Sequence, residues 1–274
     1  MTISVILSVH NGKPYVEQAI KSILAQTYRE FEFLIVDDGS TDGSADLLAD
    51  FAKRDSRVRV MTNKVNLGLT QSLSNALRQA QGICIARMDA DDVALPNRLE
   101  KQYEFLQTHP EIGVVGTAYD WIDDSGVVIG QPHVITDTRA LHAALIRTNP
   151  FLHGSVLIRK TLLDEVHGYN DQFKKAQDYD LWLRLSSVCQ FANLSEILMH
   201  KRMSKHMISF QNEREQLRFA VRARWNAINR NDYPVWTLVY LIKPFIASLL
   251  PLPIVRWTRI HLFGQKIYAH PALK

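Results

Sequence analysis

The chain has 274 residues and a mass of 31.4 kDa, and 46% of its residues are hydrophobic while 22% are charged. These values are typical of a globular protein and exclude a disordered, collagen-like or coiled-coil chain. The two cysteines, Cys84 and Cys189, are too few for a disulfide framework or a four-cysteine zinc site, which favours a reducing compartment.

The net charge of +4 is distributed unevenly along the chain. Residues 214–274 hold ten lysines and arginines against two acids, whereas residues 1–213 have a balance of −4. A uniformly basic nucleic-acid binder would not show this distribution, so we expect no nucleic-acid partner. A neutral-to-acidic body with a basic tail favours contact between the tail and an anionic surface.

Strand and helix patterns alternate along the first 108 residues. Residues 2–9 are apolar but too short for a secretory signal, and no basic segment precedes them, so we interpret them as a strand. The predicted strands are residues 3–9, 31–36, 58–62 and 83–88, and the predicted helices are residues 15–26, 45–53, 69–81 and 96–108. This order predicts an α/β fold with a mainly parallel sheet and helices on both faces.

The patterns of the second half are more mixed. Residues 114–121 and 127–129 flank the turn sequence Asp123-Asp124-Ser125-Gly126 and predict a hairpin. The other predicted elements are helices at 138–147, 177–188 and 208–229 and strands at 155–159 and 196–203. Residues 234–255 are strongly apolar, with one lysine and four prolines, so we place a boundary near residue 232.

Three polar segments follow predicted strands of the first half: His10-Asn11, Asp37-Asp38 and Asp89–Asp92. Ligands bind open parallel sheets at the carboxyl ends of the strands, so the coincidence of these segments predicts a binding site there. The chain contains neither G-x-G-x-x-G nor G-x-x-x-x-G-K-[ST], which disfavours a dinucleotide-binding dehydrogenase and a P-loop enzyme.

The acids after the fourth predicted strand are candidates for a metal site. In an extended segment Asp89 and Asp91 lie on the same side, and carboxylates so close together repel one another unless a cation lies between them. Oxygen ligands suit Mg²⁺ or Mn²⁺. A solvated acidic turn is the alternative interpretation of this motif.

Asp38 stands at the end of the second predicted strand. Ser40, Thr41 or Asp42 can cap the helix that follows. A cap does not account for two carboxylates at the strand end itself. A carboxylate in that place could accept hydrogen bonds from a nucleobase or a ribose.

Asp178 and Asp180 open a predicted helix. Either can be a first-turn acid that stabilises the helix dipole, or a general base near a sugar hydroxyl, and the pattern alone does not decide between them. The ten histidines show no zinc-binding spacing. A basic group further along the chain could contact a diphosphate; its members are Lys201, Arg202, Lys205 and His206.

Five segments together resemble the family 2 glycosyltransferases, which have the GT-A fold. These segments are residues 4–44, 66–69, 82–102, 151–160 and 177–185. The sequence Ala86-Arg-Met-Asp-Ala-Asp-Asp92 is similar to the bacterial branch of the family that builds capsule, O-antigen or exopolysaccharide repeats. The resemblance implies a GT-A-like nucleotide-sugar-binding domain followed by a helical apolar and basic tail.

The resemblance also implies where a nucleotide would bind. Ser8, His10 and Asn11 would line the nucleoside pocket. Asp38 would contact the base, which in the family is usually uracil. Asp89 would lie near the ribose and the diphosphate.

Catalytic and metal-binding residues follow from the same resemblance. Asp178 matches the catalytic base, although Gln177 replaces the acid that usually precedes it. Asp91 matches the metal-binding acid of the D-x-D motif, with Mn²⁺ or Mg²⁺ as the cofactor. His206 falls where some members of the family have a ligand for the diphosphate or the metal.

The implied function is an inverting, metal-dependent transfer of a sugar from a nucleoside diphosphate sugar, with uridine diphosphate as the favoured nucleotide. The acceptor would be a glycan or a polyprenyl-linked sugar in cell-surface polysaccharide synthesis. Two alternatives are a nucleotidyltransferase that makes sugar nucleotides and a non-catalytic nucleotide-sugar-binding scaffold. The sequence His10–Tyr15 lacks the glycine- and arginine-rich loop of the nucleotidyltransferases, and the complete set of acids argues against the scaffold.

We therefore expect a glycosyltransferase domain at residues 1–232, with a nucleotide-binding half at 1–108 and an acceptor half at 109–232. Residues 233–274 would form a membrane-associating tail. Three prolines and Lys243 interrupt its apolar run, so segments lying in the interface are favoured over a spanning helix. The protein would be cytoplasmic and peripheral on the inner face of the plasma membrane. The alternative is that residues 236–255 pack on the body as closing helices.

Overall fold

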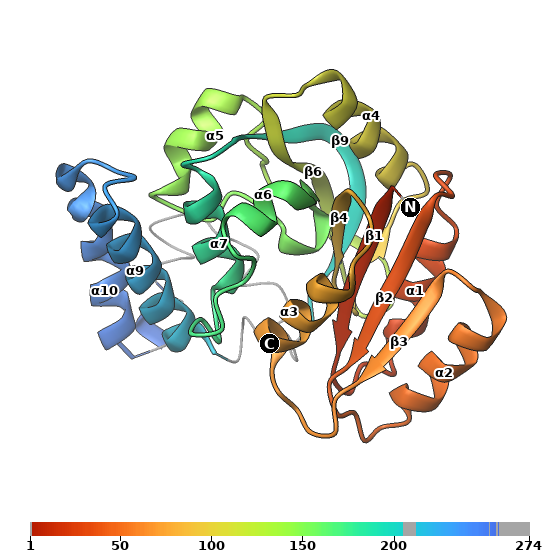
Figure 1. Ribbon diagram of the computed structural model, residues 1–274. Coiled ribbons are helices and arrows are strands. Elements are labelled where there is room, and N and C mark those ends of the chain that lie inside the picture. Colours follow the sequence, from red (N-terminus) through yellow and green to blue (C-terminus); the bar gives the residue numbers. More distant parts are fainter. Residues whose placement is uncertain (1, 205–211, 252, 256, 258–274) are drawn as a thin grey trace.

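The computed structural model describes residues 2–204, 212–251, 253–255 and 257. In the described residues the strands form one curled sheet with the order β3-β2-β1-β4-β8-β6-β9-β5, and β7 pairs with β6 (Figure 1). Helices cover both faces of this sheet. The α/β class predicted from the sequence is confirmed.

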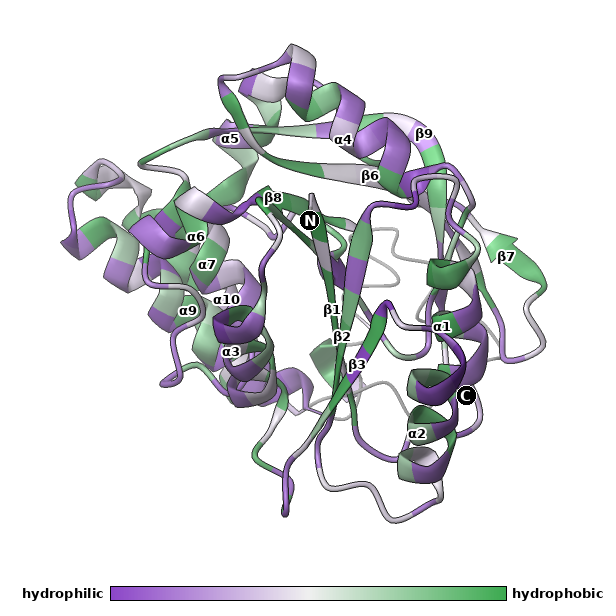
Figure 2. Ribbon diagram, turned by 45° about the vertical axis from the view of Figure 1, so that its right-hand side comes forward, coloured by the Kyte–Doolittle hydropathy of each residue, from purple (hydrophilic) through white to green (hydrophobic). Residues whose placement is uncertain are grey.

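The first half of the chain is a parallel unit. Its strands β1 (Ile3–Val9), β2 (Phe31–Asp37), β3 (Val58–Thr62) and β4 (Cys84–Met88) pair in parallel. Its helices are α1 (Val16–Leu24), α2 (Ser44–Arg54), α3 (Leu69–Gln79) and α4 (Arg98–Thr108). β1 and β2 consist mostly of hydrophobic residues (Figure 2). Almost all of their side chains are buried, as expected for strands that are covered on both faces.

The second half extends this sheet with mixed pairing. Its strands are β5 (Val93–Ala94), β6 (Ile112–Ile122), β7 (Val128–Gly130), β8 (Leu157–Arg159) and β9 (Gln190–Arg202). β8 is antiparallel to both β4 and β6, β6 is parallel to β9, and β9 is antiparallel to β5. The predicted hairpin is the pair of β6 and β7.

The helical elements of the second half gather largely on one side of the sheet. They are α5 (Thr138–Leu145), η1 (His153–Ser155), α6 (Lys160–Glu165), α7 (Gln177–Leu185), α9 (Glu213–Asn229), η2 (Val235–Leu238) and α10 (Val239–Leu249). In Figure 1 α9 lies between α7 and α10, and contacts join α9 to both neighbours. The predicted helix 208–229 begins at Glu213 in the part of the chain that the structure describes.

Side chains that alternate along the strands build two cores. Ile3, Val5 and Leu7 of β1 face one cluster, which includes α1, whereas Ile6 faces the other, which includes α3, α7 and α9. This is the period of two expected for a strand. The second cluster includes Trp182 of α7, the largest fully buried side chain. The helix that carries Asp178 is therefore anchored in the core.

Replacing Trp182 with alanine should lower the free energy of unfolding by about 3–5 kcal/mol, because the substitution leaves a large cavity in the core. Denaturant unfolding followed by circular dichroism measures this change. Trp225→Ala is the matched control, since Trp225 on α9 is about half exposed, and its effect should stay within about 0.5 kcal/mol. Equal effects of the two substitutions would contradict this assignment of the core.

Candidate active site

The loops after β1 and β2 meet at the carboxyl end of the sheet. The His10 Nδ1 atom donates to the carbonyl oxygen of Asp38 at 2.9 Å, and the Asn11 Oδ1 atom accepts from the Thr41 amide at 2.8 Å. Asn11 has a φ of 53°, in the left-handed region that asparagine tolerates better than most residues. Ser8 is opposite Val36 in the ladder between β1 and β2. The structure thus places Ser8, His10 and Asn11, which were predicted to line a nucleoside pocket, at the same end of the sheet as Asp38, which was predicted to contact the base.

Asp38 holds a third loop at this place. Its carboxylate accepts hydrogen bonds from the Asn63 side chain (2.8 Å) and from the amides of Leu67 (2.8 Å) and Gly68 (2.9 Å). The Asp38 side chain is only 2% exposed. Sequence analysis missed this anchoring role, although residues 66–69 were part of the family resemblance. The predicted contact between Asp38 and a base remains a prediction.

The acids Asp89, Asp91 and Asp92 follow β4, and two of their carboxylates are held by hydrogen bonds from arginine residues. The Arg87 Nη2 atom donates to the Asp89 Oδ1 atom at 2.5 Å, and the Asp92 Oδ1 atom accepts from the Arg202 amide at 2.9 Å. Arg202 lies at the end of β9, so the second half of the chain completes this acid cluster.

The Arg202 guanidinium holds three other segments of the chain together through hydrogen bonds. It donates to the carbonyl oxygens of Asp91 (3.0 Å) and Asp123 (2.6 Å) and to the Gln18 side chain (2.7 Å), and it is buried. These bonds tie β9 to α1, to the hairpin turn and to the acid cluster. The diphosphate contact considered for Arg202 would have to compete with them.

Electrostatics distinguish the three acids. Burial and the nearby charge of Asp89 raise the pKa of Asp91 to about 6. Burial and the charges of Asp91 and Asp89 raise the pKa of Asp92 well above its usual range. Burial is the largest influence on Asp89 and opposes its ionisation, but the charges of Arg87 and Lys201 and the hydrogen bond from Arg87 together outweigh burial and hold the pKa of Asp89 below its usual value. The cluster therefore contains a carboxylate, Asp91, that the cations of the chain do not fully stabilise.

Lys201 supplies a further positive charge to this cluster. Burial opposes its protonation, yet Tyr119 and the three acids keep the pKa of Lys201 above its usual value. The ammonium is therefore charged. Among the described residues, no group of three or more histidine, cysteine or acidic side chains is arranged to hold a metal ion on its own. A metal held by Asp91 would need oxygen ligands from a bound molecule as well.

The short turn η1 lies directly against the acid cluster. A Cβ atom at Gly154 would lie 2.8 Å from the Asp89 Oδ2 atom and 3.0 Å from the Asp92 Oδ2 atom. Only glycine lets the backbone approach two carboxylates this closely without displacing them. Sequence analysis did not single out Gly154, although it lies in the segment 151–160 that carries the resemblance.

His153 joins the same turn to the helix of Asp178. Its Nε2 atom shares a hydrogen bond with the Tyr169 hydroxyl at 2.8 Å, and its ring packs edge-on against Trp182 of α7. Burial, and then the charge of Arg87, lower the pKa of His153 to about 4, so the imidazole is neutral at physiological pH. Sequence analysis assigned no role to His153.

Asp178 lies at the first turn of α7. Its Oδ2 atom accepts a hydrogen bond from the Asn149 side chain at 2.7 Å, and the side chain is partly exposed. The charges of both Asp178 and Asp89 act on His153 and on Tyr169. Asp178 and the acid cluster therefore approach the same two residues, although 89 positions separate Asp89 from Asp178 in the sequence.

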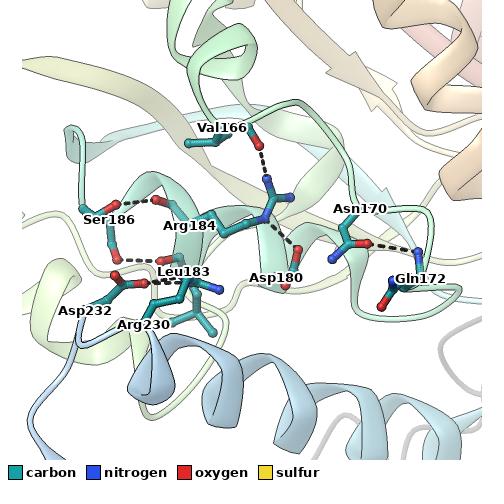
Figure 3. A network of polar contacts seen from close by, with 10 residues as sticks. Val166, Asn170, Gln172, Asp180, Leu183, Arg184, Ser186, Arg230 and Asp232 are labelled. Carbon is teal, nitrogen blue, oxygen red and sulfur yellow. Dashed lines mark hydrogen bonds and ion pairs between the residues drawn. The ribbon is translucent and has the colours of Figure 1, made fainter.

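Asp180 has a different environment (Figure 3). Its carboxylate accepts from the Arg184 Nε atom at 2.8 Å, one helical turn away, and is 1% exposed. Arg184 also donates to the carbonyl oxygen of Val166 at 2.6 Å. Asp180 therefore anchors α7 and has no access to solvent, which leaves Asp178 as the better candidate for a base. His206 and Lys205, also considered for this site, lie outside the described residues.

Comparison with known proteins matches this chain to glycosyltransferases. The model of glycosyl transferase family 2 matches residues 4–166. The chain is 35% identical to the O-antigen biosynthesis glycosyltransferase WbnJ of Escherichia coli, over 73% of this chain and 79% of WbnJ. It is 30% identical to EpsE of Bacillus subtilis (strain 168), provisionally named a glycosyltransferase, over 96% and 95% of the two chains. It is 29% identical to the amylovoran biosynthesis glycosyltransferase AmsE of Erwinia amylovora, over 93% and 96%.

Solved structures match the fold. TarS 1–349 of S. aureus superposes with a TM-score of 0.70 at 20% identity, over 97% of this chain and 75% of that one. The mannosyltransferase PcManGT of Pyrobaculum calidifontis, solved with GDP-Man and Mn²⁺, superposes with a TM-score of 0.65 at 18% identity, over 97% and 81%. At these identities the likeness shows the fold alone, and it confirms the expected GT-A architecture.

Replacing Gly154 with alanine should weaken the binding of uridine diphosphate with Mn²⁺ at least about tenfold, because the new methyl group displaces the carboxylates of Asp89 and Asp92. These carboxylates cannot simply turn away, since Arg87 and the Arg202 amide hold them. Isothermal titration calorimetry measures the affinity, and the melting temperature of the variant checks that it is folded. Parental affinity in a folded Gly154→Ala variant would contradict the geometry described.

Proposed function

The chain belongs to glycosyl transferase family 2, and on this premise we propose that it transfers a sugar from a nucleoside diphosphate sugar to an acceptor hydroxyl with inversion. One observation carries the proposal: the turn η1 lies against Asp89 and Asp92 through Gly154 and packs through His153 on Trp182 of α7, the helix that carries Asp178. An acceptor next to Asp178 and a diphosphate next to the acid cluster would then lie on opposite sides of one anomeric carbon.

In the proposed reaction Asp178 takes the proton of the acceptor hydroxyl. The acceptor oxygen forms a bond to the anomeric carbon while the bond from that carbon to the diphosphate oxygen breaks on the opposite face. Asn149 holds one oxygen of the Asp178 carboxylate, which leaves the other oxygen for the acceptor. A single displacement of this kind inverts the anomeric configuration and needs no second, nucleophilic carboxylate.

The acid cluster fits a divalent metal. It offers carboxylate oxygens, and the raised pKa of Asp91 shows a buried acid that another positive charge would stabilise. Asp91, with Asp89 close by, would hold Mg²⁺ or Mn²⁺ together with the diphosphate oxygens. A bound metal would neutralise the negative charge that develops on the departing diphosphate. Lys201 would add a fixed positive charge from the protein side. A role for His206 as a further ligand remains a prediction.

For the donor we propose a uridine diphosphate sugar, bound by the loops of Ser8, His10, Asn11 and Asp38. TarS has been solved with UDP-GlcNAc, which supports this nucleotide, whereas PcManGT has been solved with GDP-Man. The loop that Asp38 anchors, residues 66–68, would close one side of the nucleoside pocket.

For the acceptor we propose a glycan or a polyprenyl-linked sugar of a cell-surface polysaccharide. The names of WbnJ and AmsE, which refer to O-antigen and amylovoran biosynthesis, support this class. A lipid-linked acceptor would place the enzyme in the cytoplasm at the inner face of the plasma membrane, with the tail 233–274 in contact with the lipid surface. No helix within the described ranges is long and apolar enough to cross a membrane.

Replacing Asp178 with asparagine should lower the turnover number about 10²–10⁴-fold and leave donor affinity unchanged, because a general base is lost while the donor contacts stay. Nucleotide release from a panel of sugar nucleotides, with product analysis, gives the turnover. Asp180→Asn serves as the comparison, since it removes the charge that pairs with Arg184 and should act mainly on stability. A catalytically dead but stable Asp180→Asn beside an active Asp178→Asn would contradict the assignment.

The metal site should depend on pH. Since protonation competes with the metal for Asp91, Mn²⁺ affinity in the presence of uridine diphosphate should fall as the pH drops below about 6 and level off above it. Electron paramagnetic resonance of free Mn²⁺ measures this affinity. In Asp91→Asn the affinity should be low at every pH, and full activity of the parent protein in EDTA would contradict metal dependence.

A further inference from the structure

The helix α10 exposes an apolar face. Its outward side chains are between 50% and 63% exposed and comprise Val239, Ile242, Phe245, Ile246 and Leu249. At 100° per residue these positions fall within one third of the helix circumference. Val235 and Trp236, which precede α10 in η2, are exposed to a similar degree at 67% and 64%. α10 contains no acidic residue.

The opposite side of α10 is already packed. Tyr240, Leu241 and the preceding Leu238 lie against the core cluster that includes Ala223 and Ala227 of α9. Figure 1 shows α10 at the outer margin of the molecule, with α9 between it and α7. The helix is therefore held by the body of the protein, and its exposed face does not result from an unfolded tail. The packing of α10 on the body agrees with the alternative expectation for residues 236–255, and contact of the tail with a membrane stays a prediction.

Two basic groups lie beside this face. Lys243 is exposed on α10 itself, and the Arg214 Nη2 atom donates to the carbonyl oxygen of Leu250 at the end of the helix. Residues 214–274 together have a balance of +8. Exposed Trp236 and Trp257 are of the type that favours the boundary between lipid and water. An apolar strip with a basic rim is complementary to an anionic lipid surface.

We propose that the α10 face, defined as Val235, Trp236, Val239, Ile242, Phe245, Ile246 and Leu249, binds the surface of an anionic phospholipid bilayer. The inference rests on the proposed function, because an enzyme that uses a lipid-linked acceptor has to reach that acceptor at the membrane surface. The eleven residues of α10 extend over about 16 Å, roughly half the thickness of the hydrocarbon core, so the helix lies in the interface and does not cross it.

The structure connects this face to the candidate base. The Arg147 guanidinium lies 5.0 Å from the ring centroid of Tyr240, on the packed side of α10. Two residues further along the chain, Asn149 donates to Asp178. Arg224 of α9 donates to the carbonyl oxygens of Ile146 and Arg147 and fixes this segment to α9. An acceptor sugar whose lipid is held in a bilayer at α10 would thus enter beside the segment that holds Asp178.

The test uses the full-length protein and the double variant Ile242→Gln/Ile246→Gln. Glutamine keeps a high helix propensity and adds no charge, so the change removes hydrophobic insertion alone. Ile83→Gln is the matched control, because Ile83 is a similarly exposed isoleucine (59%) outside the α10 face. Cosedimentation with vesicles of phosphatidylcholine, with and without phosphatidylglycerol, measures binding, and sedimentation velocity gives the oligomeric state.

The parent protein and Ile83→Gln should pellet with the phosphatidylglycerol vesicles, less so in high salt, and weakly with phosphatidylcholine alone. The double variant should bind at least about tenfold more weakly. The proposal is overturned if the double variant pellets like the parent, if the parent ignores both kinds of vesicle, or if the parent is a dimer that the double variant dissociates. In the last case a second copy covers the face.

Nucleotide release in the absence of vesicles separates this proposal from the proposed function. It should be the same in the parent protein, the double variant and the control, because α10 lies outside the donor site. If the parent releases no nucleotide from any sugar nucleotide, the proposed function fails while the vesicle result still decides the role of α10.

Discussion

Mutual repulsion among the carboxylates after β4 is the constraint on which the site depends. Asp89, Asp91 and Asp92 are held within one short segment, with Asp92 buried and the other two partly buried, an arrangement that is unfavourable without positive charge. Arg87 of β4 and Lys201 of β9 supply part of that charge. This compensation is incomplete at Asp91 and at Asp92, so a further positive charge beside them would be favourable.

Two parts of the second half of the chain contact this acid cluster, namely Arg202 of β9 and the turn η1. Arg202 brings β9 to the acids and at the same time binds α1 and the hairpin turn. The turn η1 brings the backbone of Gly154 against two of the carboxylates, and its neighbour His153 reaches Tyr169 and the helix of Asp178. A displacement of η1 would therefore disturb the acids and the candidate base together. Coupling of this kind is suited to a reaction in which a leaving group and an attacking group must be aligned on opposite faces of one carbon.

The sequence predicted the parallel first half well because β1, β2 and β4 are continuous apolar runs separated by amphipathic helices. It did not predict the mixed pairing of the second half, where β8 has only three residues and its partners are distant in sequence. The same distance hid the roles of individual side chains. The Arg202 amide meets Asp92 across 110 positions, and Asp38 holds a loop 29 positions away. By contrast, the pairing of Asp180 with Arg184 one helical turn later was visible in the sequence and could have favoured Asp178 from the start.

The central claim is that the acids after β4 and Asp178 act on one sugar nucleotide. A crystal structure of the protein with Mn²⁺ and a uridine diphosphate sugar tests it most directly, with the metal located by its anomalous scattering. The account predicts Mn²⁺ between the Asp91 carboxylate and the diphosphate, with the anomeric carbon facing Asp178. A donor bound with its sugar directed away from Asp178, or a metal held by residues outside the acid cluster, would contradict it.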